Sequence, residues 1–373
     1  MSFSEKDRIW MRKALILAQK GEGYTSPNPM VGCVIVSSNG DLIGEGYHER
    51  FGREHAEVLA IDSVEDRHSL LDATLYVTLE PCSHHGKTPP CCEMVGKLPL
   101  RRVVVAMEDP NPKVSGRGIR YLEERGISVE CGLLRAEAEA LNRFYLHHLE
   151  FGRPFVTLKI AQTSDGYTAA PDGGSRWITG KESRTLVHRW RSRYDAVMVG
   201  RNTAELDNPT LTVRHIEGRQ PLRVVIDGPL SLPSNLHLFS DQYEEKTILI
   251  THNEQRARET LDPMLKMMQS NYFRGKTLVV PERDGHSDLH RTMKALGEEG
   301  VTSLLVEAGQ SLSSALLRAG LVDRLELFIA PVLLGGGTRS VLGLGIQRIE
   351  DMIPFREVEW QQVGADMLMS ATF

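Results

Sequence analysis

The order of apolar and polar positions in residues 4–150 predicts helices alternating with strands. Apolar side chains at helical spacing follow Ser4 and Asp7, which can cap a first helix that ends near Gly21. Asn39 and Gly40 lie between two apolar runs and predict a two-residue hairpin turn. Strands are expected at residues 31–36, 42–47, 73–79, 102–107 and 127–133, and helices at residues 55–63, 91–98, 116–125 and 135–150. This alternation predicts a three-layer α/β domain.

A second α/β alternation begins after Gly152 and Pro154, which terminate the helix over residues 135–150. We therefore expect two domains, residues 1–150 and 151–373. In the second, strands are expected at residues 155–160, 196–199, 222–226, 247–251, 277–280, 303–306 and 324–329. Helices are expected at residues 181–193, 288–299 and 311–319.

Composition narrows the class of protein. The 373 residues are 41% hydrophobic and 25% charged, which is typical of globular domains. The net charge of −5 argues against a nucleic-acid binder. The longest apolar runs are too short for a membrane span, and the charged N-terminal segment lacks a signal peptide, so we expect a cytoplasmic protein. Five cysteines, of which Cys91 and Cys92 are adjacent, argue against a disulfide framework. Cys33 and Cys131 lie in strand-like runs and are expected in the core.

The sequence between residues 55 and 91 carries the strongest chemical signal. His55 is followed by Glu57, and Pro81 precedes Cys82. A zinc ion held by one imidazole and two thiolates, with a nearby carboxylate that is not a ligand, is the arrangement of zinc nucleobase deaminases. Cys91 would be the second thiolate, although it follows Cys82 by nine residues rather than three.

Other interpretations of this segment stay open. The cysteines could form a structural zinc site or simply pack in the core. Cys92 could replace Cys91 as a ligand, and His84 and His85 could compete for the metal, although their loop position favours substrate contact or solvation.

Three features of the second half indicate a binding site. The turn from Glu307 to Ser311 separates a strand from a helix, and a helix start can bind phosphate through free N–H groups. A polar loop over residues 203–214 ends in Arg214, which with Arg191 could clamp a phosphate. Lys159 lies inside an apolar strand, where lysine is uncommon unless it is paired or functional. The alternatives are a plain strand-to-helix turn and solvated arginines.

The segment from Leu79 to Cys91, with its Pro-ended loop between the two cysteines, resembles the deaminase half of the bifunctional riboflavin-biosynthesis deaminase/reductase family. The second half resembles the reductase half of the same family. The resemblance implies a cytidine-deaminase-like three-layer domain followed by a dihydrofolate-reductase-like α/β domain that uses NADPH. It also implies a phosphorylated pyrimidine substrate and a homodimer.

The resemblance also implies roles for individual residues. The catalytic side chains would be Glu57 and Lys159, and the zinc ligands His55, Cys82 and Cys91. NADPH would be contacted by Ala161, Trp177, Thr203, Asp207, Gly228, Gly309, Gln310, Ser311, Leu312, Ser313, Ser314 and Ala315. Substrate would be contacted by Asn28, His48, Lys87, Ser175, Arg191, Leu211, Arg214 and Glu307.

We therefore expect a two-step enzyme. The first step is zinc-dependent deamination of 2,5-diamino-6-ribosylamino-4(3H)-pyrimidinone 5′-phosphate, and the second is NADPH-dependent reduction of the ribosyl group to a ribityl chain. Two other classes stay open: a nucleoside or tRNA deaminase fused to an unrelated α/β domain, and a non-catalytic binding protein with a structural zinc.

Overall fold

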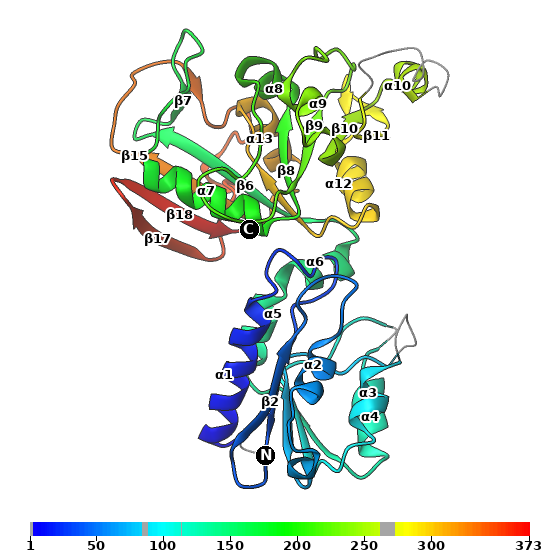
Figure 1. Ribbon diagram of the computed structural model, residues 1–373. Coiled ribbons are helices and arrows are strands. Elements are labelled where there is room, and N and C mark those ends of the chain that lie inside the picture. The colour runs from blue at the N-terminus through cyan, green and yellow to red at the C-terminus, as the bar shows by residue number, and fades with distance from the viewer. Residues whose placement is uncertain (1–2, 84–88, 113, 262–272) are drawn as a thin grey trace. The chain divides into compact units, whose positions relative to one another are not determined.

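A computed structural model describes residues 3–83, 89–112, 114–261 and 273–373. The chain forms two compact units, Met1–Phe151 and Gly152–Phe373, which are described separately (Figure 1). Within the described part of the chain, no helix is both long enough and apolar enough to cross a bilayer.

The described residues of the first unit form a five-stranded sheet in the order β2-β1-β3-β4-β5. Strand β1 pairs antiparallel with β2 and β3, whereas β3, β4 and β5 run parallel. The strands are β1 (Gly32–Val36), β2 (Leu42–Tyr47), β3 (Thr74–Val77), β4 (Arg102–Val105) and β5 (Ser128–Cys131). The helices are α1 (Glu5–Gln19), α2 (Ala56–Asp62), α3 (Cys91–Val95), α4 (Arg117–Glu123), α5 (Arg135–Leu141) and α6 (Arg143–Phe151), with a 3-10 turn at Arg67–Leu70.

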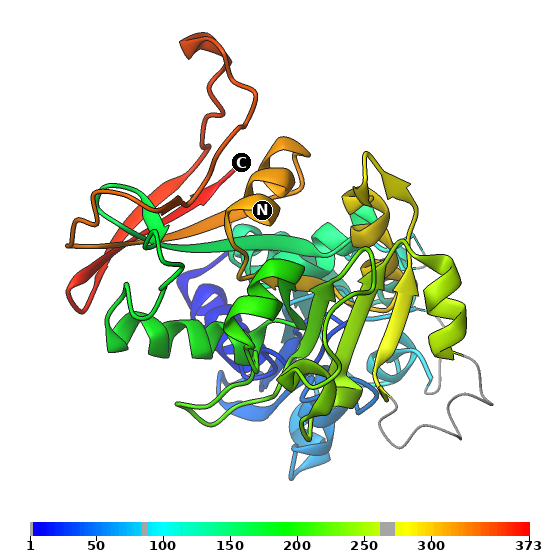
Figure 2. The same ribbon diagram turned by 90° about the horizontal axis from the view of Figure 1, so that it is seen from above.

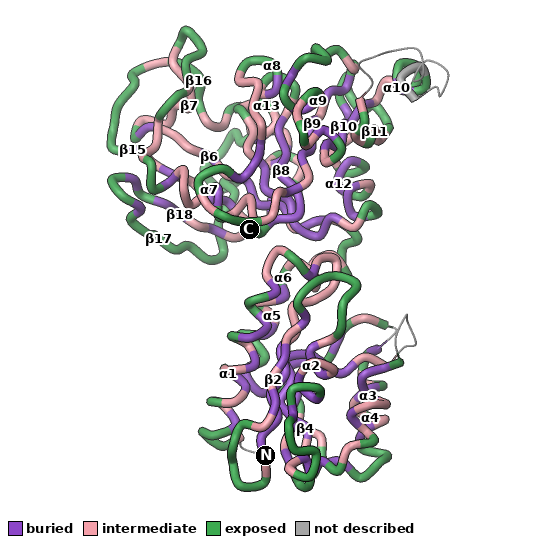
Figure 3. The backbone as a smooth tube through the Cα atoms, viewed as in Figure 1, coloured by how far each residue is buried: buried purple, intermediate pink, exposed green. Residues whose placement is uncertain are grey.

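Helices cover both faces of this sheet. Successive side chains of a strand point to opposite sides, so each central strand contributes to two cores. Cys33 and Ile35 join the core beneath α2, α3 and α4, whereas Val34 and Val36 join the core beneath α1 and α5. The central strands β1, β3 and β4 are mostly buried, whereas the edge strand β5 has no buried residue (Figure 3). The predicted three-layer α/β arrangement is confirmed.

Helix α1 begins as predicted. Ser4 accepts a hydrogen bond from the Asp7 backbone N–H, and the Asp7 carboxylate accepts one from the Ser4 backbone in return. Asp7 also accepts hydrogen bonds from Tyr76 on β3 and Arg102 on β4. The residue that caps the helix therefore also ties it to the sheet.

Two predictions in this unit are wrong. The helix expected over residues 135–150 is broken at Asn142, whose buried side chain donates to the Met30 carbonyl and accepts from the Met30 N–H. A partner 112 residues away in the sequence therefore fixes the break. Cys131 was expected in the core but is exposed, because it ends β5 at the edge of the sheet.

The second unit contains, over its described residues, a nine-stranded sheet in the order β11-β10-β9-β8-β14-β6-β15-β18-β17. The strands from β11 to β15 run parallel, and β18 and β17 complete the sheet as an antiparallel pair. The strands of this sheet are β6 (Phe155–Thr163), β8 (Ala196–Gly200), β9 (Leu222–Ile226), β10 (Thr247–Thr251), β11 (Lys276–Val279), β14 (Ser303–Val306), β15 (Arg324–Ala330), β17 (Val358–Val363) and β18 (Asp366–Thr372).

Helices pack on this sheet, and short strand pairs lie at its margins. The helices are α7 (Lys181–Arg193), α8 (Arg201–Asp207), α9 (His237–Ser240), α10 (Glu254–Leu261), α12 (Leu289–Glu298) and α13 (Gln310–Arg318). The short pairs are β7 (Tyr167–Ala169) with β16 (Thr338–Arg339), and β12 (Glu282–Arg283) with β13 (His286–Ser287). The turns are Glu244–Lys246 and Ile349–Asp351. The dihydrofolate-reductase-like α/β class expected for this half is confirmed.

The second half also differs from expectation in detail. The segment 203–214 was expected to be a polar loop, but its first residues belong to α8. Strands β17 and β18 were not predicted at all. Between β15 and β17 the chain forms a long arm, which extends away from the sheet (Figure 2).

Candidate active sites

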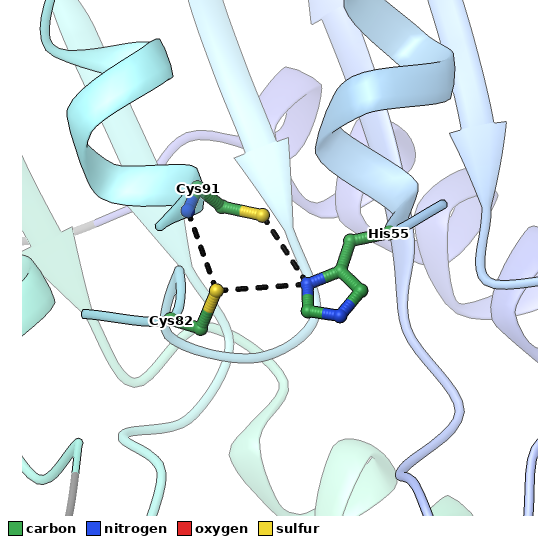
Figure 4. Close-up of side chains that lie close together, drawn as sticks. All are labelled: His55, Cys82 and Cys91. Carbon is green, nitrogen blue, oxygen red and sulfur yellow. Dashed lines mark hydrogen bonds between the residues drawn. The ribbon is translucent and has the colours of Figure 1, made fainter. Parts of the chain in front are cut away.

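Three metal-ligand side chains meet at one end of the first sheet. His55 immediately precedes α2, Cys82 follows β3, and Cys91 is the first residue of α3. The His55 Nδ1 atom lies 3.6 Å from the Cys82 sulfur and 3.3 Å from the Cys91 sulfur (Figure 4). All three ligand atoms fall within 4.8 Å of one another. The structure thus brings together the three residues predicted as zinc ligands.

The electrostatics of this cluster favour a cation. The Cys91 thiol and the His55 ring, which hydrogen-bond to the Cys82 sulfur, lower the pKa of Cys82 although its burial acts in the opposite direction. The Cys91 backbone N–H also donates to the Cys82 sulfur at 3.3 Å. A lowered pKa favours the thiolate form of Cys82, and a thiolate is the form that binds metal.

The distances suit a tetrahedral zinc. With Zn–S bonds of about 2.3 Å and Zn–N bonds of about 2.1 Å, tetrahedral geometry separates sulfur and nitrogen ligands by about 3.6 Å. The two measured separations are 3.6 and 3.3 Å. Two thiols and one imidazole are a donor set typical of zinc, and three protein ligands leave a fourth position for water.

Glu57 lies beside the cluster on the first turn of α2. Its side chain is 3% exposed, and its Oε2 atom has no hydrogen-bond partner among the described residues. Burial, with a smaller contribution from the Cys82 charge, raises the pKa of Glu57 to about 7. A buried carboxylate with one free oxygen needs a partner supplied by a metal, a water or a substrate.

Asn28 and His48 lie near this cluster and contact each other. The Asn28 Nδ2 atom is 3.2 Å from His48 Nε2, and the His48 ring packs edge-on against the His55 ring with the centroids 5.5 Å apart. Burial lowers the pKa of His48. Lys87, His84 and His85 lie outside the described residues, so their predicted places stay predictions.

The second unit has a charged cluster at the centre of its sheet. Glu307 follows β14, and its carboxylate accepts two hydrogen bonds from Arg191 of α7, at 2.6 and 3.0 Å. The Lys159 ammonium on the neighbouring strand β6 lies 3.9 Å from Glu307. Burial lowers the pKa of Lys159. Burial would raise the pKa of Glu307, but Arg191 and Lys159 hold it at about 2.

Arg214 lies next to this cluster. Its guanidinium donates to the Thr210 hydroxyl at 2.8 Å, and its backbone N–H donates to His188 Nδ1 at 3.3 Å. Burial and the neighbouring Arg191 lower the pKa of His188 to about 4, so its ring stays neutral. His188 does not stand out in the sequence, although its place one helical turn before Arg191 puts both side chains on one face of α7.

The starts of two helices meet beside the same cluster. Gly200 precedes α8 and Gly309 precedes α13, and neither helix has a side-chain cap. A Cβ atom on Gly309 would lie 3.5 Å from the Thr203 hydroxyl, and one on Gly200 would lie 3.4 Å from Leu312. Because β8 and β14 are neighbouring parallel strands, their carboxyl ends form one edge, where α/β sheets bind ligands.

The remaining predicted contacts are spread around this edge. Arg176, next to the half-buried Ser175, donates to the Asp207 carbonyl at 2.8 Å, so the loop that carries Ser175 and Trp177 meets the end of α8. Trp177 is 67% exposed, with the Arg184 guanidinium over its ring.

The other predicted contacts lie on separate elements of the second unit. Ala161 packs near α7, and Leu211 is buried in the segment that also carries Thr210 and Thr212. Gly228 follows β9 and abuts His252, on the far side of β8 from the charged cluster.

Two family models match the chain. Residues 4–107 match the cytidine and deoxycytidylate deaminase zinc-binding region, and residues 154–369 match the RibD C-terminal domain. The first match contains the cysteine cluster, and the second contains the charged cluster around Glu307.

Relatives match over nearly the whole chain. The riboflavin biosynthesis protein RibD of Escherichia coli is 40% identical, with 98% of each chain covered. That of Actinobacillus pleuropneumoniae is 39% identical, covering 97% of this chain and 94% of the relative.

Solved structures agree with these sequence matches. Acinetobacter baumannii RibD superposes with a TM-score of 0.86 at 34% identity over 99% of both chains. A Thermotoga maritima diaminohydroxyphosphoribosylaminopyrimidine deaminase/5-amino-6-(5-phosphoribosylamino)uracil reductase gives 0.84 at 33% identity over 98% of both. The chain therefore belongs to the RibD family of bifunctional riboflavin-biosynthesis enzymes, which join a zinc-dependent deaminase to an NADPH-dependent reductase.

Proposed function

We propose that the first unit deaminates 2,5-diamino-6-ribosylamino-4(3H)-pyrimidinone 5′-phosphate, and that the second unit reduces the ribosyl group of the deaminated product. The observation that carries the first assignment is the cluster of His55, Cys82 and Cys91 beside the buried Glu57. The observation that carries the second is the buried Lys159 beside Glu307 and Arg191.

In the deaminase site, His55, Cys82 and Cys91 hold zinc, which when bound acidifies a water molecule so that it becomes a nucleophile near neutral pH. Glu57 accepts the proton that the attacking water loses. The water oxygen bonds to the ring carbon that carries the 2-amino group, and Glu57 then delivers the proton to the departing nitrogen, which leaves as ammonia. Burial keeps the Glu57 carboxylate out of bulk water, so that its proton passes to the reacting atoms.

In the reductase site, the chain holds NADPH, which when bound supplies the hydride that reduces the ribose C1′ atom. Lys159 protonates or polarises the ring oxygen as the sugar opens. Glu307 holds Lys159 and Arg191 in place, since it contacts both. Because burial lowers the pKa of Lys159, its ammonium gives up a proton more readily than an exposed lysine does.

The edge of the sheet where α8 and α13 begin is the proposed NADPH-binding site. Unpaired N–H groups at a helix start bind phosphate, and α13 presents Gly309, Gln310 and Ser311 at its first turn. Thr203 lies at the same edge, and Asp207 ends α8, where the loop that carries Trp177 meets this helix. Ala161 on strand β6 and Gly228, which follows strand β9, complete the set of proposed contacts.

Two arginines are proposed for the substrate phosphate of the reductase, Arg191 and Arg214. Both lie at the cluster around Glu307, and guanidinium groups bind phosphate through paired hydrogen bonds. Lys87 is proposed for the same phosphate in the deaminase site. A phosphate common to both steps gives each site a remote group whose binding energy aligns the reacting carbon.

A homodimer and a cytoplasmic location are also proposed. Of the 23 exposed large apolar side chains among the described residues, 12 lie in residues 332–367. Exposed apolar side chains that are concentrated in one segment are typical of a protein–protein interface. Strand β17, which carries Val358 and Trp360 of this set, is an edge of the sheet. All five cysteines are free, as expected in a reducing compartment.

The test measures ammonia release and NADPH oxidation separately, with and without a zinc chelator. We expect chelation to stop ammonia release from the pyrimidinone phosphate. NADPH oxidation with supplied deaminated product should continue, and added zinc should restore the first signal. Loss of both signals on chelation would contradict the assignment of the metal to the first unit alone.

A further inference from the structure

Both ring nitrogens of His48 are already engaged within the protein. Nδ1 lies 2.9 Å from the Glu54 carbonyl oxygen, and Nε2 lies 3.2 Å from Asn28 Nδ2. The side chain is 3% exposed. A carbonyl oxygen only accepts, so Nδ1 donates, and in a neutral ring Nε2 then accepts from the Asn28 amide.

The backbone around His48 fixes this arrangement. His48 follows β2, and its N–H donates to the Val31 carbonyl at 2.9 Å, which extends the pairing of β1 and β2. Glu54 is the residue immediately before the ligand His55. The His48 ring therefore joins the segment that carries Asn28 to the segment that carries His55.

This arrangement has a consequence for the substrate. His48 has no ring nitrogen left for a ligand, whereas Asn28 keeps its side-chain oxygen, which no described residue engages. The amide orientation that His48 imposes therefore presents a hydrogen-bond acceptor, and the matching group on a pyrimidine is a ring or exocyclic N–H. The family resemblance places both side chains on the substrate, but the hydrogen bonds separate their roles.

We propose that His48 is a positioning residue that acts through Asn28, fixing the amide so that its oxygen accepts a hydrogen bond from an N–H of the pyrimidine. This inference rests on the proposed function of the first unit. It differs from a direct contact between His48 and the substrate, and from a purely structural role, because each of these makes the His48 contribution independent of Asn28.

A double-mutant cycle separates these roles. The variants are His48→Phe, which keeps a ring but loses both nitrogens, Asn28→Ala, and the pair together. His48→Gln keeps one donor and one acceptor on a planar amide, and His68→Phe is the matched control at an exposed histidine of the same unit. The measurements are kcat/KM for ammonia release, zinc retention against a chelator, and kcat/KM for NADPH oxidation.

We expect His48→Phe to lower kcat/KM for ammonia release by about 100-fold, as a misplaced contact group does. In the Asn28→Ala background the same change should cost less than about threefold, because the group that His48 orients is gone. His48→Gln should retain activity within about tenfold of the wild type. Zinc retention, NADPH oxidation and the His68→Phe control should be unchanged.

Two results would overturn the inference. Equal losses from His48→Phe with and without Asn28 would show a direct or structural role, and loss of zinc in His48→Phe would point to support of His55 alone. A wild-type chain that releases no ammonia in a zinc-dependent way would contradict the proposed function of the first unit and, with it, this inference. Zinc-dependent ammonia release by the wild type together with one of the two results above would contradict the inference alone.

Discussion

At the scale of single residues, each proposed reaction depends on a buried ionisable group held next to oppositely charged or polar partners. Glu57 is buried beside the thiolate–imidazole cluster, and Lys159 is buried beside Glu307. Burial shifts both pKa values in the direction that keeps the group neutral. A shift in this direction brings the pKa of each group closer to neutral pH, where acid–base catalysis is most effective.

Replacing Glu57 with Gln should abolish proton transfer and leave the metal cluster in place. We expect ammonia release to fall by about 10²- to 10⁴-fold, the usual contribution of a general acid–base group. Zinc content and NADPH oxidation should not change. Glu65→Gln, a change of an exposed carboxylate in the same unit, is the matched control. Near wild-type ammonia release by Glu57→Gln would exclude the proposed role and favour a structural zinc.

Replacing Lys159 with Met keeps an unbranched chain in strand β6 but removes the ammonium. We expect NADPH oxidation with the deaminated substrate to fall by about 10²-fold or more, since the proton donor is lost. Ammonia release should be unaffected, which makes the deaminase an internal control for folding. Lys181→Met, at an exposed lysine of α7, should leave both rates unchanged. An unchanged reductase rate in Lys159→Met would remove Lys159 from the mechanism.

At the scale of elements, polar side chains tie each helix to the sheet at defined points. Asp7 caps α1 and receives hydrogen bonds from Tyr76 of β3 and Arg102 of β4, and Arg102 also bonds Glu130 of β5. Burial would raise the pKa of Asp7, but the hydrogen bonds from Arg102, Tyr76 and Ser4 hold it well below its usual 3.8. The position of α1 thus depends on an ionised carboxylate.

This dependence predicts how acid affects stability. A lowered folded-state pKa means that the unfolded chain binds the Asp7 proton first, so the stabilisation is complete above the unfolded value and is lost as the pH falls below it. We expect the difference in free energy of unfolding between wild type and Asp7→Asn to stay constant from about pH 7 to pH 5 and to shrink below about pH 4. Urea unfolding at each pH measures it. A difference that stays constant below that pH would show that Asp7 carries no such shift.

At the scale of the whole molecule, the sheet of the second unit ends, over its described residues, at the edge strand β17, and exposed apolar side chains lie on this strand and on the arm before it. Strand β17 follows an arm that carries Leu333, Ile349 and Met352, all more than half exposed, and the strand itself presents Trp360 (Figure 2). Apolar groups on an open sheet edge favour association with another chain. A second copy of this chain is the occupant that we propose.

Charges placed on this surface should prevent association. We expect Ile349→Arg with Trp360→Arg to convert the dimer to monomers, as measured by light scattering at micromolar concentration, because burying an unpaired charge in an interface is unfavourable. Leu71→Arg, at an exposed leucine of the first unit, is the control and should remain dimeric. A wild-type chain that is monomeric under these conditions would contradict the proposed surface.

Much of this protein follows from its sequence alone. The apolar periodicity predicts the five strands of the first sheet and seven of the nine described strands of the second, because it records which face of each element is buried. It misses β17, β18 and the helices α8, α9 and α10. The first metal site is also visible in the sequence, since its ligands come from three consecutive segments within residues 55–91, at the ends of elements that adjoin in the sheet. The spacing of His55, Glu57, Cys82 and Cys91 predicts a metal site, and their resemblance to the riboflavin-type pattern predicts a zinc deaminase.

The tertiary structure decided the rest. Lys159 lies next to Glu307 because its strand β6 pairs with β14, which precedes Glu307. The local pattern of apolar residues does not show which strands become neighbours in a sheet. Asn142 breaks a helix because Met30, 112 residues away, offers it two hydrogen bonds. Cys131 is exposed because β5 ends the sheet. Contacts between segments far apart in the chain fix these features, and pairing of distant segments is a property of the folded molecule.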